Sequence, residues 1–383
     1  MSFCAVLKNP QPLFFFFFQV NGYFSPMAKG LEPIRWEGDS LFLLDQTKIP
    51  REKSYTKVRT LSETVKAIKE MVVRGAPAIA ITGIFGASLG FNEQVSVFSM
   101  EEVQIMLSEI LESRPTAVNL SFALDQLRDR IRVSGSKSWT QAKDLAIAFG
   151  QELLTKDLSS NRELGSNGTL LFNPNPTRLE IVTHCNTGAL ATGGHGTALG
   201  VIRSLKEKGH DLVVYADETR PFLQGSRLTA FEMMEEGIEC FIITDGMSGW
   251  LLQNKKIDAV LVGCDRIAKN GDVANKIGTY NLALVAKAHK VPFYVCATRE
   301  SFDLTKETGK DIPIEMRTPI EVTEYSFLKG KSGDSLIKPG DTSPVGAKAL
   351  NPSFDITPYE LISGYITEFG NIQSSDIPNV TRV

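Results

Sequence analysis

The 383-residue chain has few of the residues that build disulfide and metal centres, with five cysteines and four histidines. The cysteines are scattered, at Cys4, Cys185, Cys240, Cys264 and Cys296, and no C-x-x-C pair occurs. This pattern excludes a disulfide framework and a zinc knuckle, and it indicates a reducing compartment. The histidines form neither an H-E-x-x-H motif nor a set of two histidines with one carboxylate, so we expect no bound metal.

Long apolar runs and basic runs are also missing. The run Leu13–Phe18 is far shorter than the about 20 residues that cross a bilayer, and the net charge of −3 does not suggest nucleic-acid binding. We therefore expect no membrane and no nucleic acid among the partners, and a cytoplasmic location with the nucleus as the alternative. Residues 1–26 differ in composition from the rest, and we expect a disordered extension there, with a weak targeting signal as the alternative.

Residues 27–160 predict a smaller domain made of a β-hairpin or small sheet plus helices. The hairpin is expected over Ile34–Ile49, where two alternating apolar runs flank a turn. Ser159–Asn175 is rich in Ser, Asn, Gly and Pro, and it predicts a linker that we place at residues 161–178. Apolar residues at helical spacing predict the helices Leu61–Val73, Pro77–Gly90, Glu101–Leu111, Ala117–Ile131 and Thr140–Thr155.

Residues 179–383 alternate short β-branched runs with helical segments, which predicts an α/β domain with a Rossmann-like, doubly wound parallel sheet. After Pro319 only Leu361–Phe369 resembles a strand. The expected strands are Leu179–Thr183, Leu212–Ala216, Glu239–Ile243, Ala259–Val262 and Phe293–Ala297. The expected helices are Thr197–Lys208, Ser226–Glu236, Met247–Asn254 and Thr279–Ala288.

Polar residues follow the expected strands and form the candidate site. The strand that ends at Thr183 is followed by Cys185 and by a glycine-rich turn, Gly188–Gly196. A strand, a glycine turn and a helix in this order place backbone N–H groups against an anion, usually a phosphate. Asp265 and Lys276 follow another strand. Because the carboxyl ends of parallel strands meet at one edge of a sheet, we expect these residues to lie together.

Asp265 and Cys185 are the candidates for chemistry. A carboxyl group after a buried strand can have its pKa raised by desolvation and act as an acid or base; alternatively, Asp265 caps a helix or pairs with Arg266. Cys185 is either a reactive thiol or an inert core residue. The turn also suggests a dinucleotide site, but the spacing around Gly194 and Gly196 departs from G-x-G-x-x-G.

Three cations are candidates for binding a phosphate. Lys276 precedes an expected helix near Gly278, where its charge would add to free N–H groups; alternatively, it is a surface lysine. Arg74 and Arg114 each precede a proline-initiated helix in an otherwise apolar region. They are either surface charges or a fork for a phosphate or sugar hydroxyls.

The sequence resembles the family of 5-methylthioribose-1-phosphate isomerases, enzymes of methionine salvage, from about Met27 to Gly370. The superfamily also contains ribose-1,5-bisphosphate isomerases and non-catalytic regulatory subunits of the translation-initiation-factor exchange complex. The pairing of Cys185 with Asp265 favours the isomerase branch. The resemblance lies in the motifs Arg74–Gly86, Arg114–Leu120, Thr183–Gly200, Ala216–Met233 and Val262–His289.

Carried over residue by residue, the resemblance implies that Cys185 is the catalytic or transition-state-stabilising thiol and that Asp265 is the proton donor. The implied reaction converts the sugar phosphate 5-methylthioribose 1-phosphate into 5-methylthioribulose 1-phosphate without a cofactor, in a homodimer formed through the second domain. The turn Gly188–Gly196 would help to hold the phosphate. The implied substrate ligands are Arg74, Gly75, Ala76, Arg114, Gln224, Asn275 and Lys276.

Overall fold

The computed structural model describes residues 30–324, 342–344 and 346–380, so the extension expected at residues 1–26 lies outside the described residues. The chain begins with a three-stranded antiparallel sheet of β1 (Ile34–Glu37), β2 (Ser40–Leu44) and β3 (Tyr55–Val58). β1 and β2 form the predicted hairpin. The third strand was not predicted, and it pairs with β2.

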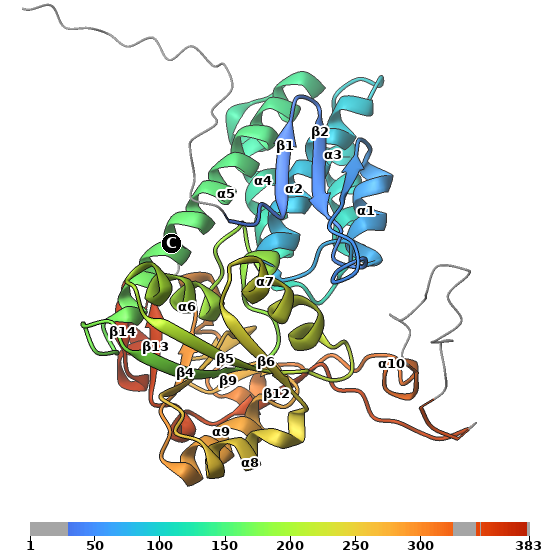
Figure 1. Ribbon diagram of the computed structural model, residues 1–383. Helices are drawn as coiled ribbons and strands as arrows, with labels where there is room; N and C mark the ends of the chain where they lie inside the picture. Colours follow the sequence, from blue (N-terminus) through green and yellow to red (C-terminus); the bar gives the residue numbers. More distant parts are fainter. Residues whose placement is uncertain (1–29, 325–341, 345, 381–383) are drawn as a thin grey trace, which may run out of the picture.

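Five helices complete this N-terminal part and surround one hydrophobic core (Figure 1). The centre of the core is α2, whose residues from Ala78 to Phe91 are all buried. A helix that is apolar on every side is stable only when other elements surround it. The helices are α1 (Leu61–Lys69), α2 (Ala76–Glu93), α3 (Met100–Glu112), α4 (Val118–Ser134) and α5 (Trp139–Thr169).

The prediction of a linker at residues 161–178 is wrong over 161–169, because α5 continues to Thr169. Its polar and small residues form a packing face. A methyl group on Gly165 would overlap Ser204, and one on Gly168 would overlap Val201, so these glycines let α5 approach the next helix closely. Tertiary contacts thus override low helix propensity. As Figure 1 shows, α5 runs from the N-terminal part down to the large sheet.

The large sheet has the strand order β6-β5-β4-β7-β10-β13-β14, with every pair parallel except β13 with β14. The first six strands follow the order of doubly wound sheets, in which ligands bind where the chain order reverses, here between β4 and β7. The predicted α/β fold is confirmed. The strands are β4 (Arg178–Thr183), β5 (Asp211–Asp217), β6 (Glu239–Ile243), β7 (Ala259–Val262), β10 (Phe293–Cys296), β13 (Gly364–Thr367) and β14 (Gly370–Ile372).

Helices cover both faces of this sheet because its strands are apolar on both sides. Ile181 packs with α6 in one core, while the next residue, Val182, packs with α8 and α9 in another. Successive side chains on a strand point to opposite faces, which explains this alternation. The helices are α6 (Ala198–Glu207), α7 (Ala230–Glu235), α8 (Ser248–Asn254) and α9 (Thr279–His289), with a π-helical turn at Gly225–Thr229 before α7.

A second small sheet, with the order β11-β8-β9-β12, follows the carboxyl end of β7 and was not predicted. Its strands are too short to show a clear period in the sequence. They are β8 (Arg266–Ala268), β9 (Val273–Lys276), β11 (Phe302–Asp303) and β12 (Phe354–Thr357). A short helix, α10 (Ile320–Thr323), precedes the C-terminal strands. Of the helices in the described ranges, none combines the length and apolar character needed to cross a membrane.

Asp157 on α5 gives the protein a pH-dependent weakness. Burial raises the pKa of Asp157 from 3.8 to about 7, although the Gly193 N–H donates to its carboxylate at 2.6 Å. A carboxyl group whose pKa is higher in the folded than in the unfolded chain stabilises the fold fully at pH values below its unfolded-state pKa. This stabilisation is lost as the pH rises through the folded-state pKa of about 7. Asp157→Asn keeps the acceptor oxygen but carries no charge. Between pH 5 and pH 8 we expect its free energy of unfolding to rise by roughly 1–2 kcal/mol relative to that of wild type.

Urea titrations at the two pH values measure this difference. Asp144→Asn, a change of the same kind on the same helix, serves as the control and should show no such gain. A pH-independent difference between wild type and Asp157→Asn would contradict the assignment.

Candidate active site

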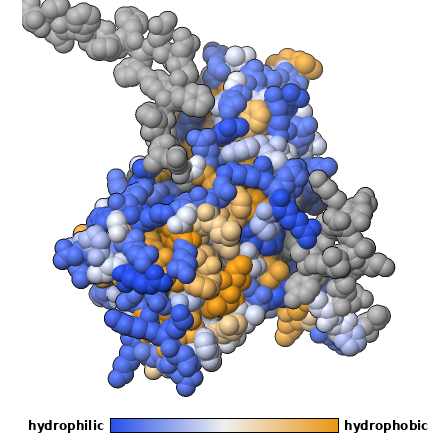
Figure 2. All heavy atoms as spheres, in the orientation of Figure 1, coloured by the Kyte–Doolittle hydropathy of each residue, from blue (hydrophilic) through white to orange (hydrophobic). Residues whose placement is uncertain are grey.

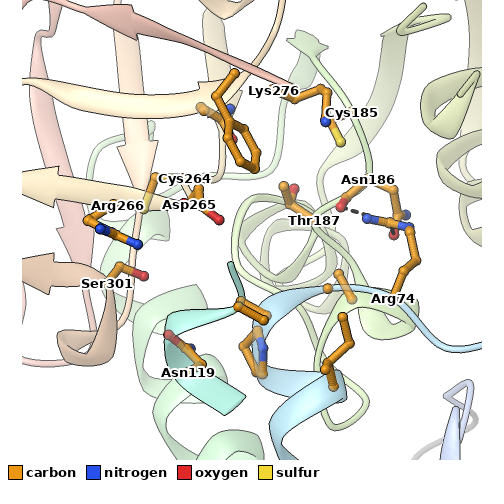
Figure 3. Close-up of a pocket in the computed structure, with 18 of the residues that line it drawn as sticks. Arg74, Asn119, Cys185, Asn186, Thr187, Cys264, Asp265, Arg266, Lys276 and Ser301 are labelled. Atoms are coloured by element: carbon orange, nitrogen blue, oxygen red, sulfur yellow. Dashed lines mark hydrogen bonds between the residues drawn. The ribbon is translucent and has the colours of Figure 1, made fainter. Parts of the chain in front are cut away.

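A cavity of about 200 Å³ lies between the N-terminal helices and the carboxyl edge of the large sheet (Figure 3). The structure brings together the predicted catalytic residues and the predicted substrate ligands. Arg74, Arg114, Cys185, Asp265 and Lys276 therefore line one cavity although they are far apart in the chain. The other predicted residues on its wall are Gly75, Ala76, Gln224 and Asn275.

The hairpin of β8 and β9 places the predicted acid beside a cation. Asp265 precedes β8, and its N–H donates to the carbonyl of Ala274 on β9 at 2.9 Å. Burial raises the pKa of Asp265, against the opposing charges of Arg266 and Lys276. Arg266 itself pairs with Asp303 at 3.6 Å, which leaves the Asp265 carboxyl facing the cavity (Figure 3). The carboxyl group is therefore available as a proton donor.

Cys185 lies in a turn after β4 with φ at 66°, a conformation that residues other than glycine rarely adopt. Two threonines hold it there. Its N–H donates to Thr219 Oγ1 at 2.8 Å, and its carbonyl accepts from Thr229 Oγ1 at 2.6 Å. The sulfur faces the cavity (Figure 3), and charge on it acts on both Arg74 and Lys276. The thiol thus lies on the wall of the cavity between two cations.

The turn between α1 and α2 carries Arg74 into the site. Arg74 Nη2 donates to the Asn186 carbonyl at 3.0 Å and also to Asn186 Oδ1. Gly75 has φ at 98°, and any side chain there would overlap the backbone of Ala191. Gly75 therefore allows a backbone-to-backbone contact that only glycine permits. Ala76 begins α2 and lines the cavity.

Arg114 enters the cavity from the turn between α3 and α4. Burial lowers the pKa of Arg114, and the nearby charge of Arg317 acts in the same direction. Burial likewise lowers the pKa of Lys276. Several cations that share a desolvated space repel one another, and an anion placed among them removes this repulsion. The site is thus suited to a phosphate ester.

Several buried polar atoms on the cavity wall have no hydrogen-bond partner within the described part of the chain. They are Arg74 Nε, Asn161 Oδ1, Thr187 Oγ1 and Gln224 Oε1. Buried polar atoms are almost always hydrogen-bonded, so such a group on one wall indicates a polar ligand. Both donors and acceptors are present among them, which suits a molecule with hydroxyl groups.

The glycine turn Gly188–Gly196 does not form the predicted phosphate cradle. It does surround an anion, but that anion is the side chain of Glu232, which accepts from Ala189 N at 2.7 Å and Leu190 N at 3.2 Å. Gly193 N donates to Asp157 instead. These three amides therefore bind carboxylates of the protein itself. The prediction that they help to hold the phosphate is wrong.

The N-terminus of α9 is likewise already occupied. Asp355, which follows Phe354 on β12, accepts from Gly278 N at 2.7 Å and from Tyr280 N at 3.1 Å. The prediction that free N–H groups at the start of this helix add to the charge of Lys276 is thus wrong. The ammonium group of Lys276 instead lies over the Phe354 ring, 4.7 Å from its centroid.

His184 holds the loop after Lys276 in place. Its Nδ1 lies 3.0 Å from Asp217 Oδ2, and its Nε2 donates to the Ile277 carbonyl at 2.9 Å. Burial lowers the pKa of His184, but the Asp217 partner raises it more, to about 9. His184, Asp217 and Asp245 lie close enough to bind a metal. However, the atoms that would bind it already make hydrogen bonds. Asp245 accepts from two backbone N–H groups, and Asp217 accepts from a serine hydroxyl and pairs with the imidazole of His184.

Many residues of the wall escaped the sequence analysis, and five of them come from two segments that show why. Asn186 and Thr187 follow Cys185 directly, and their position in the same turn was a usable signal. The other residues, Glu315, Arg317 and Phe354, come from a segment without a regular pattern, and the sequence gives no sign of their role.

Comparisons with known proteins identify the family. Residues 72–374 match the model of the initiation factor 2 subunit family. A methylthioribose-1-phosphate isomerase from Leptospira biflexa is 60% identical over 88% of this chain and 94% of its own length. One from Thermotoga neapolitana is 46% identical over 91% and 97%.

Solved structures show the same fold. The 5-methylthioribose 1-phosphate isomerase from Pyrococcus horikoshii superposes with a TM-score of 0.79 at 33% identity, covering 92% of this chain and 95% of that chain. A protein from A. fulgidus described as translation initiation factor eIF-2B, subunit delta, gives 0.78 at 37% identity, with 91% and 99% covered. The chain therefore belongs to the initiation factor 2 subunit family, and its curated relatives place it among the methylthioribose-1-phosphate isomerases.

Proposed function

We propose that this protein converts 5-methylthioribose 1-phosphate into 5-methylthioribulose 1-phosphate, an aldose–ketose isomerisation. The observation that carries the proposal is the shared cavity, in which a thiol and a desolvated carboxyl group lie among several cations. The names and the similarity of the relatives support the same reaction.

Asp265 acts first in this proposal. The phosphate on the anomeric carbon prevents the spontaneous ring opening of a free aldose, so the ring oxygen must receive a proton. Burial raises the pKa of Asp265, which keeps a larger fraction of the carboxyl group protonated near neutral pH than in an exposed aspartate. Asp265 donates this proton as the bond between C1 and the ring oxygen breaks, and its carboxylate later accepts the proton that the C2 hydroxyl loses when the ketone forms, which restores the acid.

Cys185 acts at the next step, when hydrogen moves from C2 to C1. In one route its thiolate removes the C2 proton, an enediol-like intermediate forms, and the resulting thiol delivers a proton to C1. In the other route a hydride moves directly from C2 to C1, and Cys185 stabilises the charge. Turnover in D₂O separates the two, since only the first route exchanges the transferred hydrogen with solvent.

The phosphate is held by cationic side chains. Arg74 and Arg114 come from turns between the N-terminal helices, and Lys276 comes from β9, so both parts of the chain contribute to binding the phosphate. Because the glycine turn is occupied by Glu232, side chains rather than backbone amides neutralise the phosphate. Arginine and lysine suit this role, since guanidinium can bind two oxygens and ammonium supplies a compact charge.

Proton and phosphorus NMR of wild-type enzyme with the methylthio sugar phosphate tests the function. We expect the anomeric phosphate signal to be replaced by that of a primary ketose phosphate, without added nicotinamide or metal. A folded wild-type protein that binds the sugar but leaves it unchanged would instead support a regulatory role. Faster turnover of ribose 1,5-bisphosphate in direct competition would favour the bisphosphate isomerase alternative.

We also propose a homodimer formed through the edge of the large sheet. β6 is the terminal strand of that sheet, and an unpaired apolar edge strand favours association. Phe241 and Ile242 on β6 are 47% and 52% exposed, and Trp250 on α8 is 58% exposed. Figure 2 shows hydrophobic side chains gathered on the face of the sheet that carries β6. A second copy of the chain would cover this face.

We expect Ile242→Glu to convert the dimer to a monomer, because a buried unpaired carboxylate at an interface is strongly unfavourable. Sedimentation velocity measures the mass of each species. Val97→Glu, at an apolar residue that is 90% exposed on the N-terminal part, is the matched control and should leave the mass unchanged. A monomeric wild type at micromolar concentration would contradict the proposal.

A further inference from the structure

Glu232 is a fully buried carboxylate that the proposed reaction does not use. It lies on α7 with 0% of its surface exposed. Each of its oxygens accepts two hydrogen bonds. Oε1 accepts from Asn186 Nδ2 at 2.7 Å and Leu190 N at 3.2 Å, while Oε2 accepts from Ala189 N at 2.7 Å and Arg203 Nη2 at 2.6 Å. A carboxylate with this many donors is held in one orientation.

This orientation determines how the Asn186 amide is turned. A carboxylate only accepts hydrogen bonds, so the NH₂ end of Asn186 must face Glu232. The amide oxygen then faces the opposite way, where Arg74 Nη2 donates to it. With the amide turned the other way, an NH₂ group would face the guanidinium, and both groups are donors. Glu232 therefore decides whether the Asn186 side chain can add a second bond to Arg74, beside the one that its backbone carbonyl accepts.

The π-helical turn before α7 also fixes the backbone of Cys185. Thr229, three residues before Glu232, donates to the Cys185 carbonyl at 2.6 Å and lies 3.3 Å from Asn186 Nδ2. The buried Arg203 accounts for part of the charge of Glu232, and Glu236 also pairs with Arg203 at 2.6 Å. Glu236 has no hydrogen bond to Asn186 in the described structure. Two carboxylates thus share one arginine, and only one of them reaches the site.

We propose that Glu232 is a positioning residue that, through Asn186, fixes the Arg74 guanidinium for the phosphate of the substrate. The free Nε of Arg74 is buried on the cavity wall without a partner among the described residues, so this side chain is already aimed at a ligand. The inference rests on the proposed function for the identity of that ligand. Its chemical class, a phosphate ester, follows from the cations around it.

The test is a double-mutant cycle between Glu232→Gln and Arg74→Ala. We expect Glu232→Gln to raise KM for the sugar phosphate about tenfold with kcat reduced less than about threefold, because the phosphate is bound alike in the ground and transition states. In the Arg74→Ala background, Glu232→Gln should change KM less than about twofold, since its partner is gone. Glu236→Gln, which also loses a bond to Arg203, is the matched control with wild-type KM.

Calorimetric titration with the sugar phosphate gives a second readout that does not need turnover. If wild type binds the sugar without converting it, the proposed reaction fails, while the affinities still test the role of Glu232. If Glu232→Gln does not fold, Asn186→Ala replaces it in the cycle, because this variant leaves the other three bonds of Glu232 intact. The proposal would be overturned if the effects of Glu232→Gln and Arg74→Ala on KM multiplied in the double variant. It would also be overturned if Glu232→Gln bound the sugar phosphate with the affinity of wild type.

Discussion

Replacing Asp265 by asparagine is expected to lower kcat for ketose formation by about 10²- to 10⁴-fold, the usual contribution of a positioned general acid. Asparagine has nearly the same shape but no transferable acidic proton, so the ring of the sugar phosphate stays closed. The cations that bind the phosphate are unchanged, and KM should therefore change little. The NMR assay measures the initial rate, with enzyme added in proportion to the loss.

Asp211→Asn is the matched control, because Asp211 is exposed at the start of β5 and pairs with Arg178 at 2.7 Å far from the cavity. Such surface pairs contribute little to stability. The pH profile gives a second test. Because burial raises the pKa of Asp265, wild-type kcat/KM should fall as the pH rises through this pKa, and the fall should be missing in Asp265→Asn. A variant that retains wild-type turnover would remove Asp265 from the mechanism.

Replacing Cys185 by alanine is expected to lower kcat by about 10²- to 10³-fold, because both proposed routes need its sulfur next to the migrating hydrogen. The backbone bonds that Thr219 and Thr229 make to Cys185 do not involve the side chain. The variant should therefore fold and bind the sugar phosphate with an affinity close to that of wild type. Calorimetry measures the binding and the NMR assay measures the rate.

Cys185→Ser helps to separate the two roles, because a hydroxyl group can still donate a hydrogen bond but is a much poorer base than a thiolate. Retention of about a tenth of the activity would favour charge stabilisation. Cys240→Ser, at a half-buried thiol on β6 outside the cavity, is the control for the chemical change. Full activity in Cys185→Ala would refute the role of the thiol.

The position of the site could be predicted because it follows from sheet topology. Cys185 and Asp265 follow neighbouring parallel strands, β4 and β7, so the rule that carboxyl ends meet at one edge was sufficient to bring them together. The partners of the backbone amides could not be predicted in this way. Glu232 and Asp355 reach the glycine turn and the start of α9 from distant elements, and a strand–turn–helix pattern does not show whether its anion is a ligand or a side chain.

The end of α5 shows a related limit. Local propensity favours a loop where glycine, serine and asparagine accumulate. In the folded chain Gly165 and Gly168 instead allow α5 to approach α6, and the contact stabilises the helix more than its composition weakens it. Only a partner that lies elsewhere in the sequence distinguishes a small-residue packing face from a linker.

The strand β12 has a consequence for biosynthesis. It carries Phe354, which lies under the Lys276 ammonium, and Asp355, which caps α9. A chain still emerging from the ribosome therefore exposes Cys185 and Asp265 long before the surface that supports Lys276 exists. We therefore expect a polypeptide truncated before Phe354 to lack both the ring under the Lys276 ammonium group and the carboxylate that caps α9.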